Sequence, residues 1–259
     1  MKSIVFYASA VILVCMMIVI IYQNQEKPVF RLLTVSQYYS YLYEENQNIE
    51  IPIYINQEIH PMTQVDSYSN IYLSNETETK KIQIELTKIS YGHEENYLNE
   101  SYHQYLLYFK IPYLDNTYQI DDLYMHMTLI NETSYTLYLG ELSIINMHEE
   151  SEFILWNSLS GTKAENSFLS RLGEIYVSYD SMSKLIDQIE IGASYDVSFE
   201  VLEDRITIHI PYAEYLLSNV PILIHAVDGS IQTIANFRYL IDYQVLKESG
   251  PLIHAYAAD

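Results

Sequence analysis

The histidines and carboxylates of this chain are the residues most able to carry out chemistry, and their spacing decides what they could do. The chain contains eight histidines, and no two stand at the His-x-His or His-x-x-x-His spacing that lets one element present two metal ligands. Adjacent glutamates occur at 44–45, 94–95 and 149–150, whereas glycoside hydrolysis needs two carboxylates held across a cleft. These patterns favour neither a metal site nor a hydrolase.

Three other kinds of site are also poorly supported. The stretch "DNTYQIDD" at 115–122 could offer oxygen ligands to calcium, but it lacks the alternating acidic residues and the glycine of a dedicated loop. No Gly-x-Ser-x-Gly turn and no phosphate-binding glycine loop occurs. Cys15 is the single cysteine, which excludes disulfides and thiolate metal sites after it. We therefore predict a non-enzymatic protein with no catalytic residue, no cofactor site and no metal site.

A repeated stretch carries more information than any of these motifs. "KIPYLDNTYQIDDLYMH" at 110–126 is matched ninety-nine positions later by "HIPYAEYLLSNVPILIH" at 209–225. Two weaker matches precede it in the same order, "IYLS" at Ile71 with "IYVS" at Ile175, and "KIQIE" at Lys81 with "DQIEI" at Asp187. The order predicts two copies of one unit, with Ile111 on Ile210 and His126 on His225. Chance similarity among strands rich in Ile and Tyr is the alternative.

The repeat is a feature of packing, and it also indicates a possible contact surface. In "LYMHMTL", apolar residues alternate with Tyr124 and His126, which predicts one buried and one solvated face of a strand. His225 holds the matching place in the second copy. Tyrosine is abundant, with 27 residues, and it suits both strands and contact surfaces. We predict that Tyr124, His126, Tyr138 and His225 form contact surface, and that Tyr38, Tyr39, Tyr41 and Tyr43 are also exposed.

The elements that must position these residues are short strands. From residue 49 onward, apolar runs rich in Ile, Tyr, Thr and Val alternate with polar clusters about every ten residues, which is typical of antiparallel sheet. About seven strands in about a hundred residues is the size of an immunoglobulin-like sandwich, although a different sandwich would satisfy the same pattern. We predict an all-β fold of two tandem immunoglobulin-like β-sandwich units, at 49–146 and 153–246, with a C-terminal tail at 247–259.

A single transmembrane helix is expected before the sandwiches. Residues 4–22, "IVFYASAVILVCMMIVIIY", form an uncharged apolar run long enough to cross a bilayer as a helix. The one Ala-x-Ala, which begins at Ala8, lies too early for signal cleavage, so we predict an uncleaved signal anchor at 1–22. Leu32, Val35 and Tyr39 follow at three- and four-residue spacing. This spacing predicts a juxtamembrane stalk at 23–48 that is partly helical.

Charge and composition limit the partners. The net charge of −21 at pH 7 excludes nucleic acid and anionic lipid surfaces as favourable partners. We expect a single-pass cell-membrane protein that contacts the bilayer through 4–22 and holds its C-terminal part outside the cytoplasm. Its function would be to bind another membrane or cell-surface protein. The alternative is a carbohydrate-binding module for cell-surface polysaccharide, which the presence of one tryptophan, Trp156, makes less attractive.

Three sequons allow two interpretations. They begin at Asn75, Asn99 and Asn131. They would accept glycans in a eukaryotic secretory pathway. Otherwise they are turn residues, because Asn and Thr side chains form hydrogen bonds in tight bends.

Overall fold

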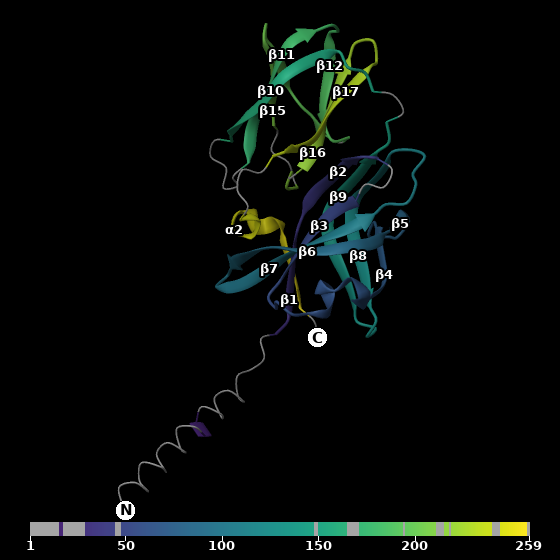
Figure 1. The fold of residues 1–259 in the computed structure, drawn as a ribbon, viewed down its shortest axis with the longest axis vertical. Coiled ribbons are helices and arrows are strands. Elements are labelled where there is room, and N and C mark those ends of the chain that lie inside the picture. Colours follow the sequence, from purple (N-terminus) through teal and green to yellow (C-terminus); the bar gives the residue numbers. More distant parts are fainter. Residues whose placement is uncertain are drawn as a thin grey trace, which may run out of the picture. The chain divides into compact units, whose positions relative to one another are not determined.

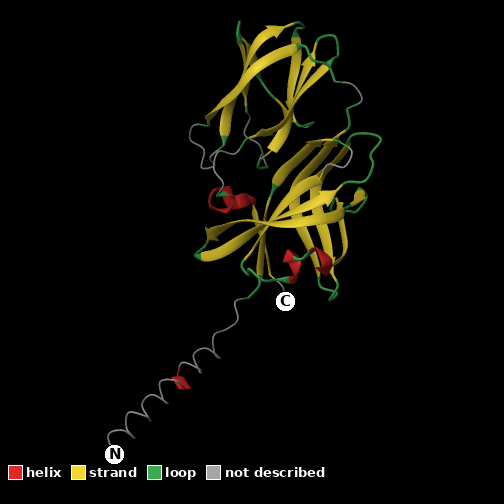
Figure 2. Cartoon of the chain, viewed as in Figure 1, coloured by secondary structure: helices red, strands yellow, loops and turns green. Residues whose placement is uncertain are grey.

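The computed structural model describes residues 16–17, 29–44, 48–147, 150–164, 171–193, 195–210, 215–217, 219–239 and 244–257 (Figure 1). The chain divides into two compact units, Met1–Phe30 with Ala257–Asp259, and Arg31–Tyr256. Strands dominate the second unit, and its described helices are short (Figure 2). The predicted all-β fold is confirmed.

The predicted transmembrane helix falls almost wholly outside these residues. Of positions 4–22, only Met16 and Met17 are described, and both are helical. Within the described ranges, no helix is both long enough and apolar enough to span a bilayer. The anchor stays a prediction.

The first sandwich consists of two five-stranded sheets. One has the order β18-β1-β3-β7-β6, formed by Ile253–Ala257, Arg31–Val35, Asn48–Ile55, Glu100–Lys110 and Glu85–Tyr97. The other has the order β2-β9-β8-β4-β5, formed by Gln37–Leu42, Ser134–Ile145, Tyr118–Leu129, Tyr68–Ser74 and Lys81–Gln83. Two 3₁₀ turns, η1 (Pro61–Thr63) and η2 (Val65–Ser67), lie between β3 and β4.

Side-chain alternation explains why β8 forms where it does. Leu123, Met125 and Met127 are buried, whereas Tyr124 and His126 are only half-buried. Successive side chains of a strand point to opposite faces of its sheet, so the apolar set enters the core and the aromatic set remains outside. The predicted alternation in this strand is confirmed.

The second sandwich has two four-stranded sheets. One has the order β10-β11-β15-β14, formed by Ile154–Lys163, Leu172–Met182, Arg205–His209 and Phe199–Val201. The other has the order β13-β12-β16-β17, formed by Tyr195–Asp196, Ile186–Ile191, Asn219–Ala226 and Ile231–Arg238. Their facing sides share one apolar core, to which Ile175, Ile206, Ile189 and Ile222 belong.

Both sandwiches have the immunoglobulin strand order. Lettered along the chain, β10, β11, β15 and β14 form an A-B-E-D sheet, and β13, β12, β16 and β17 form a C′-C-F-G sheet. In the first sandwich, β1, β3, β7 and β6 again give A-B-E-D, and β9, β8, β4 and β5 give G-F-C-C′. The prediction of two tandem immunoglobulin-like sandwiches is confirmed.

The sequence repeat matches this topology only in part. The Ile-Pro-Tyr stretches begin at the ends of β7 and β15, which are equivalent E strands. In contrast, Ile71 lies in strand C of its sandwich and Ile175 in strand B, while Lys81 lies in C′ and Asp187 in C. The two weaker matches therefore pair non-equivalent strands, because many strands of this chain share the same Ile- and Tyr-rich composition.

The two histidines of the repeat lie on equivalent F strands with a small offset. Both strands end in the same kind of turn. Leu129 N donates to the carbonyl of Thr133 after β8, and Ala226 N donates to the carbonyl of Ser230 after β16. His126 precedes this point by three residues and His225 by one. An offset of two keeps both side chains on the same face, because the side-chain period of a strand is two.

The predicted helical stalk at 23–48 is wrong in its described part. Residues 31–35 and 37–42 are strands β1 and β2, and Ser36 between them lets the chain cross from one sheet to the other. β1 pairs with β3 in antiparallel fashion, whereas β2 pairs with β9 in parallel fashion. Residues 32–40 are all buried, so tertiary packing on both faces overrides the three- and four-residue spacing. The predicted exposure of Tyr38 and Tyr39 is wrong for the same reason.

The predicted C-terminal tail at 247–259 is also wrong in its described part. Helix α2 (Val245–Ser249), the 3₁₀ turn η3 (Gly250–Leu252) and β18 return the chain to the first sandwich. Leu246 is fully buried in a small core with Leu33, Val35 and Tyr54. The predicted second unit, 153–246, accordingly extends into a helix that packs with residues of the first sandwich.

A buried carboxylate holds this returning helix. The side chain of Glu95 on β6 is 1% exposed, and it accepts hydrogen bonds from Leu246 N at 2.7 Å and from His93 Nε2 at 2.9 Å. Burial raises the pKa of Glu95, although the hydrogen bonds from Leu246 and His93 oppose that shift. The carboxylate caps free N–H groups in the first turn of α2, where they would otherwise be unsatisfied.

Tyr38 links the two sandwiches. Its side chain comes from β2 of the first sandwich, yet it belongs to the apolar core of the second. Its hydroxyl accepts a hydrogen bond from Ala193 N at 2.9 Å, and its ring meets that of Tyr195 edge to face at 5.1 Å. A Cβ on Gly192 would lie 2.4 Å from this ring, and the φ of +62° also favours glycine there.

Substitution of Tyr38 should separate the contribution of its hydroxyl from that of its ring. Tyr38→Phe should lower the free energy of unfolding by about 1 kcal/mol, because Ala193 N loses its acceptor. Tyr38→Ala should lower it by about 3–5 kcal/mol, because a cavity replaces the ring. Denaturant unfolding measures both. Tyr91→Phe, at an exposed tyrosine, is the control and should change stability by less than about 0.5 kcal/mol. Equal losses in the Phe and Ala variants would contradict the packing role of the ring.

Candidate functional site

The outer face of the sheet β2-β9-β8-β4-β5 carries a group of aromatic side chains. We call Tyr72, Tyr124, His126 and Tyr138 the aromatic face. Tyr72 on β4 lies opposite His126 on β8, and Tyr124 on β8 lies opposite Tyr138 on β9. All four are half-buried, because the alternate residues of these strands fill the core and leave this set outside. The sheet therefore brings together three of the four predicted contact residues, and it adds Tyr72.

Tyr72 is covered from two neighbouring strands. The His126 ring from β8 stacks on it with centroids 4.5 Å apart and planes 10° from parallel. The Nζ of Lys81, which belongs to β5 on the other side of β4, lies 3.5 Å from the centroid of the Tyr72 ring. This is the geometry of a cation–π contact. The ring of Tyr72 thus has little free face to offer a ligand.

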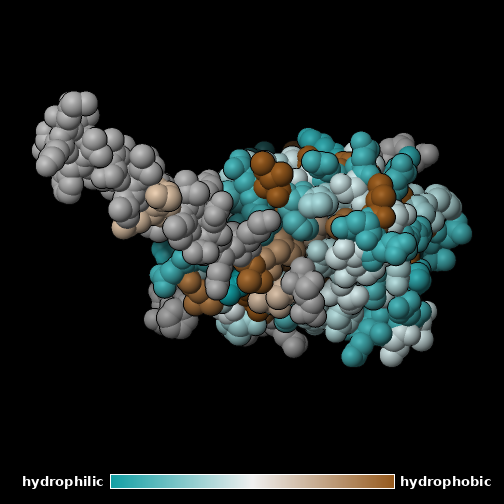
Figure 3. Space-filling view, turned by 90° about the horizontal axis from the view of Figure 1, so that it is seen from below, coloured by the Kyte–Doolittle hydropathy of each residue, from teal (hydrophilic) through white to brown (hydrophobic). Residues whose placement is uncertain are grey.

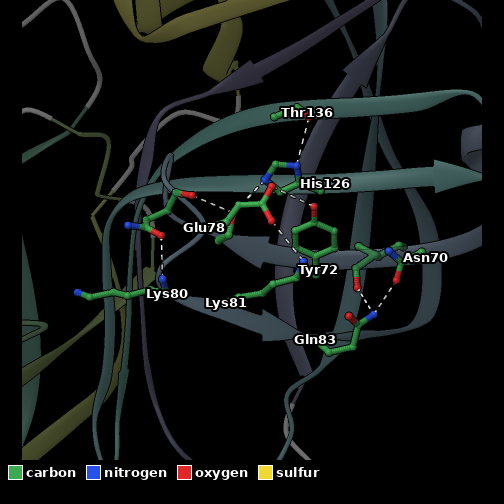
Figure 4. A network of polar contacts seen from close by, with 11 residues as sticks. Asn70, Tyr72, Glu78, Lys80, Lys81, Gln83, His126 and Thr136 are labelled. Carbon is green, nitrogen blue, oxygen red and sulfur yellow. Dashed lines mark hydrogen bonds and ion pairs between the residues drawn. The ribbon is translucent and has the colours of Figure 1, made fainter.

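Glu78 completes this network (Figure 4). Its carboxylate accepts from the Tyr72 hydroxyl and pairs with Lys81 Nζ, both at 3.4 Å. Glu78 has a φ of +53° in the turn between β4 and β5. The Asn75 side chain holds that turn, because its Oδ1 accepts from Lys80 N at 2.9 Å. The acid and the base neutralise each other next to the aromatic rings.

The contacts of His126 fix its tautomer. Its Nε2 lies 2.9 Å from Ser74 Oγ, and its Nδ1 lies 3.2 Å from Thr136 Oγ1. Ser74 Oγ donates its single proton to the carbonyl of Asn75 at 3.0 Å, so Nε2 must donate to Ser74 and Nδ1 must accept from Thr136. His126 is therefore not placed to remove the Ser74 proton, and the Ser–His contact gives no support to a nucleophilic serine.

The other end of the aromatic face meets the returning C-terminal segment. The rings of Tyr124 and Tyr138 are 5.1 Å apart and tilted by 53°. Tyr138 meets His254 edge to face at 5.0 Å, and its backbone N–H donates to the Tyr256 hydroxyl at 2.7 Å. Burial raises the pKa of Tyr124, with the acidic groups near it acting in the same direction. The tilt means that these two rings do not form a flat platform.

A polar pocket opens beside this network. It has a volume of about 460 Å³ and includes Asp66, Tyr68, Asn70 and Gln83 in its lining. The Nε2 of Gln83 donates to Asn70 Oδ1 at 3.0 Å and to the carbonyl of Ile71 at 2.7 Å (Figure 4). These bonds use both protons of the Gln83 amide. Among the described contacts, none uses Gln83 Oε1 as an acceptor or Asn70 Nδ2 as a donor.

His225, the fourth predicted contact residue, lies elsewhere. It is on β16 of the second sandwich, where its Nε2 is 3.2 Å from Glu190 Oε2 and its strand partner is Gln188. No aromatic group accompanies it in the described contacts. The two histidines of the repeat therefore share a strand position but not a chemical environment.

Other motifs of the sequence have local structural roles. Asp122, in the acidic stretch considered for calcium, accepts from Glu76 N at 2.9 Å. Across the described ranges, no three His, Cys, Asp or Glu side chains gather in a way that could hold a metal. The sequon asparagines Asn75, Asn99 and Asn131 all lie in tight turns, and Asn131 Oδ1 accepts from Thr133 N.

Exposed apolar residues do not gather at one place on the face shown in Figure 3, where hydrophobic and hydrophilic residues are intermixed. The large exposed apolar residues include Ile59, Leu98 and Ile130, and also Leu185 and Val227, whose backbones are hydrogen-bonded to each other.

Sequence reasoning missed Tyr72, Glu78 and Lys81. Tyr72 alternates with Ile71 and Leu73 in a predicted strand, so its outward direction could have been predicted. Its position opposite His126 depends on the pairing of β4 with β8, which lie more than forty residues apart along the chain. No local signal in the sequence reports that pairing.

No protein-family model and no curated protein matches the sequence. Similar solved structures include the Bacteroides ovatus mixed-linkage glucan utilization locus SGBP-B in complex with a mixed-linkage heptasaccharide, with 11% identity over 78% of this chain and a TM-score of 0.24. This chain spans 43% of that protein. The Clostridium thermocellum CbhA fibronectin(III)-like modules have 8% identity and a TM-score of 0.22, and the match covers 77% of this chain and 88% of that one. The D00-D0 domain of Intimin has 9% identity and a TM-score of 0.20, and the match covers 82% of this chain and 100% of that one. At these TM-scores the likenesses carry no argument about ligand or function.

The charges around His126 should tune its acidity in opposite directions. Burial lowers the pKa of His126 from 6.5, Glu78 raises it and Lys81 lowers it. Lys81→Met should therefore raise the pKa of His126, and Glu78→Gln should lower it further. NMR titration of the imidazole shifts measures both effects, and Lys80→Met is the control that should leave the titration unchanged. Shifts of the same sign in the first two variants would contradict the network.

The same depressed pKa gives a stability effect of known sign. Because the folded protein binds the proton of His126 less tightly than the unfolded chain does, the unfolded state gains protons first as the pH falls below 6.5. The contribution of His126 to stability is therefore complete above that pH and is lost as the pH falls through the lowered pKa.

Proposed function

We propose that this protein is a non-enzymatic interaction module that binds a protein partner at the cell membrane through its aromatic face. The observation that carries the proposal is the outward aromatic set Tyr72, Tyr124, His126 and Tyr138 on one sheet. Residues 4–22 would anchor the chain as a single span, and the sandwiches would lie outside the cytoplasm. The anchor and its orientation rest on the sequence alone.

The geometry of the rings favours a protein partner over a saccharide. Sugar stacking requires flat and accessible aromatic rings, but Tyr72 is contacted by both His126 and Lys81. Tyr124 and Tyr138 are tilted by 53°. Protein interfaces are enriched in tyrosine because it supplies rigid area with one polar end. Tilted and edge-on rings serve such a contact as well as flat ones do.

The net charge of this chain predicts the charge of its partner's contact region. The chain carries a net charge of −21, and Lys81 on the aromatic face is already paired with Glu78. A field of this sign accelerates encounter with a positively charged surface and slows encounter with a negative one. The proposed partner is therefore a membrane or cell-surface protein with a basic contact region.

The hydrogen bonds of Ser74 and His126, the most reactive pair on this face, support a non-enzymatic function. Ser74 and His126 lie within hydrogen-bond distance, but the proton of Ser74 is committed to a backbone carbonyl. Tyr72 and Lys81 are likewise bound to Glu78. These groups hold a surface in place, which is what a binding module needs.

A saccharide is the second candidate ligand, and one observation favours it. In the pocket, Gln83 Oε1 and Asn70 Nδ2 present an acceptor and a donor, with the carboxylate of Asp66 in the same lining. A hydroxyl group can both donate and accept, so sugar hydroxyls could bind these groups in the pocket.

Site-specific photo-crosslinking in intact cells tests the function. A photoreactive phenylalanine at Tyr124, in the full-length chain expressed in its own cells, should yield a discrete protein adduct. The same group at Tyr108, on the outer face of the sheet β18-β1-β3-β7-β6, is the matched control and should not yield that adduct. Adducts of polysaccharide alone at position 124 would reverse the choice of partner, and identical protein adducts at both positions would contradict the role of the aromatic face.

Accessibility of introduced cysteines tests the orientation. Ile59 and Leu185 are 85% and 73% exposed, so cysteines at these positions, in a chain whose Cys15 is replaced by serine, should react with a membrane-impermeant thiol reagent on intact cells. Labelling that requires lysis would show that the sandwiches face the cytoplasm. Recovery of a mature protein that begins beyond residue 22 would show that the span is removed.

A further inference from the structure

The four sheets have eight edge strands, and an open edge offers unpaired backbone groups to another strand. The edges are β18 and β6, β2 and β5, β10 and β14, and β13 and β17. Most of them are short, charged or covered. One is long, uncharged and open within the described part of the chain, and it has no role in the proposed function.

Two edges are covered by other parts of this chain. Beyond β2, Tyr38 N donates to the carbonyl of Leu216, and Leu216 N donates to that of Ser36. Beyond β17, Ser151 N donates to the carbonyl of Ile231 at 2.8 Å, and the Gln232 side chain binds the backbone of Ile154.

The remaining edges, apart from β10, are blunted in recognised ways. β5, β13 and β14 contain three, two and three residues, and β18 contains five. β6 is long, but it carries the charged residues Glu85, Lys88, Glu94 and Glu95, the last of which is bound to α2. Short length and charge both protect an edge against pairing.

β10 has neither form of protection over most of its length. It spans ten residues, Ile154–Lys163, and its first charged residue is the last one. Leu155 and Trp156 are 53% and 44% exposed, and most of the later residues are exposed as well. In a chain with a net charge of −21, this edge thus has nine consecutive uncharged residues.

The register of β10 limits the usable part of this edge. Its pairing with β11 shifts between Leu155 and Ser158 and again between Thr162 and Lys163, but it is continuous from Ser158 to Thr162. The shifts bend the strand at both ends. The outward side chains between them are Ser158, Ser160 and Thr162, which are small enough to let a neighbouring strand lie flat against them.

We infer that the free edge of β10 accepts an extended, basic segment of a partner protein as an added strand. Main-chain hydrogen bonds to residues 158–162 would supply the affinity, as in other cases of strand addition. The net charge of −21 favours a basic segment. Glu174, opposite Thr162, and Asp180, which accepts from Asn157 at 2.6 Å, place carboxylates beside this edge, whose only charged residue is Lys163 at its end. A second copy of this chain would bring another 21 negative charges, so a basic partner is favoured over self-association.

Amide hydrogen exchange on the intact chain tests the open edge first. Successive N–H groups of a strand point to alternate sides, so the amides of 158–162 should alternate between slow exchange, where they bind β11, and fast exchange, where they face the open side. Slow exchange at all five amides in the free protein would show that the edge is already covered and would overturn the inference.

A probe peptide then tests the partner chemistry. The probe is Lys-Val-Thr-Val-Lys-Val-Thr-Val-Lys, and at saturation it should slow the fast amides of 158–162 by about tenfold or more. The analogue with Glu in place of Lys, and the analogue with Pro at its centre, should have much smaller effects. No slowing by the basic probe, or equal slowing by all three peptides, would overturn the inference.

A charge variant completes the test. Ser160→Lys places a positive charge at the centre of the edge and should weaken binding of the basic probe several-fold, whereas Thr87→Lys, at an exposed position of the edge strand β6 in the first sandwich, should not. Photo-crosslinking at Tyr124 should be the same in both variants, so the failure of this inference is separate from the failure of the proposed function. Concentration-dependent dimers protected at 158–162 would identify a second copy as the occupant and would also overturn it.

Discussion

The burial of residues 32–40 on both sides is the constraint on which the rest of this structure depends. A strand at the surface of a sandwich normally contributes one face to a core, but β1 and β2 contribute both. One side completes the two sheets of the first sandwich. The other side is covered by Leu246 and its neighbours near β1, and by the core of the second sandwich near Tyr38. The outer sides of β1 and β2 are therefore buried only when α2 and the second sandwich are in place.

Two buried hydroxyl groups in this stretch bind other strands. Thr34 Oγ1 donates to the carbonyl of Tyr138 at 2.8 Å, and Ser36 Oγ lies 2.7 Å from His254 Nε2. A buried hydroxyl without a partner would cost free energy. These bonds therefore tie the start of the folded unit to strand β9 and to the C-terminal strand. The aromatic face lies on the same sheet, so its position is fixed by the contacts that close the fold.

Local patterns of the sequence predicted the fold class well and the long-range pairing poorly. The alternation in 123–129 identified both the core residues and the outward Tyr124 and His126, because a side-chain period of two can be recognised within a few consecutive residues. In contrast, the spacing of Leu32, Val35 and Tyr39 indicated a helix, since nothing in those residues shows that both faces will be covered. The return of 245–257 to the first sandwich was unpredictable for the same reason.

The candidate site divides along the same line. The sequence predicted Tyr124, His126 and Tyr138 as contact residues because each lies on the solvent-facing side of a strand. Tyr72, Lys81 and Glu78 were missed because their role comes from the pairing of β4 with β5 and β8. The repeat grouped His225 with His126, but equivalent strand positions do not imply equivalent neighbours. Its partner is Glu190, whereas His126 has Tyr72.

The proximity of β1 and β18 has a mechanical consequence. Arg31 and Tyr256, the ends of the larger compact unit, belong to neighbouring strands of one sheet. Tension applied through these ends would be borne first by the contact between β1 and β18 and by the bonds of Ser36. The second sandwich lies between these strands in sequence but outside the path of the load. A pull on the chain would therefore open the closure of the fold while both cores are still intact.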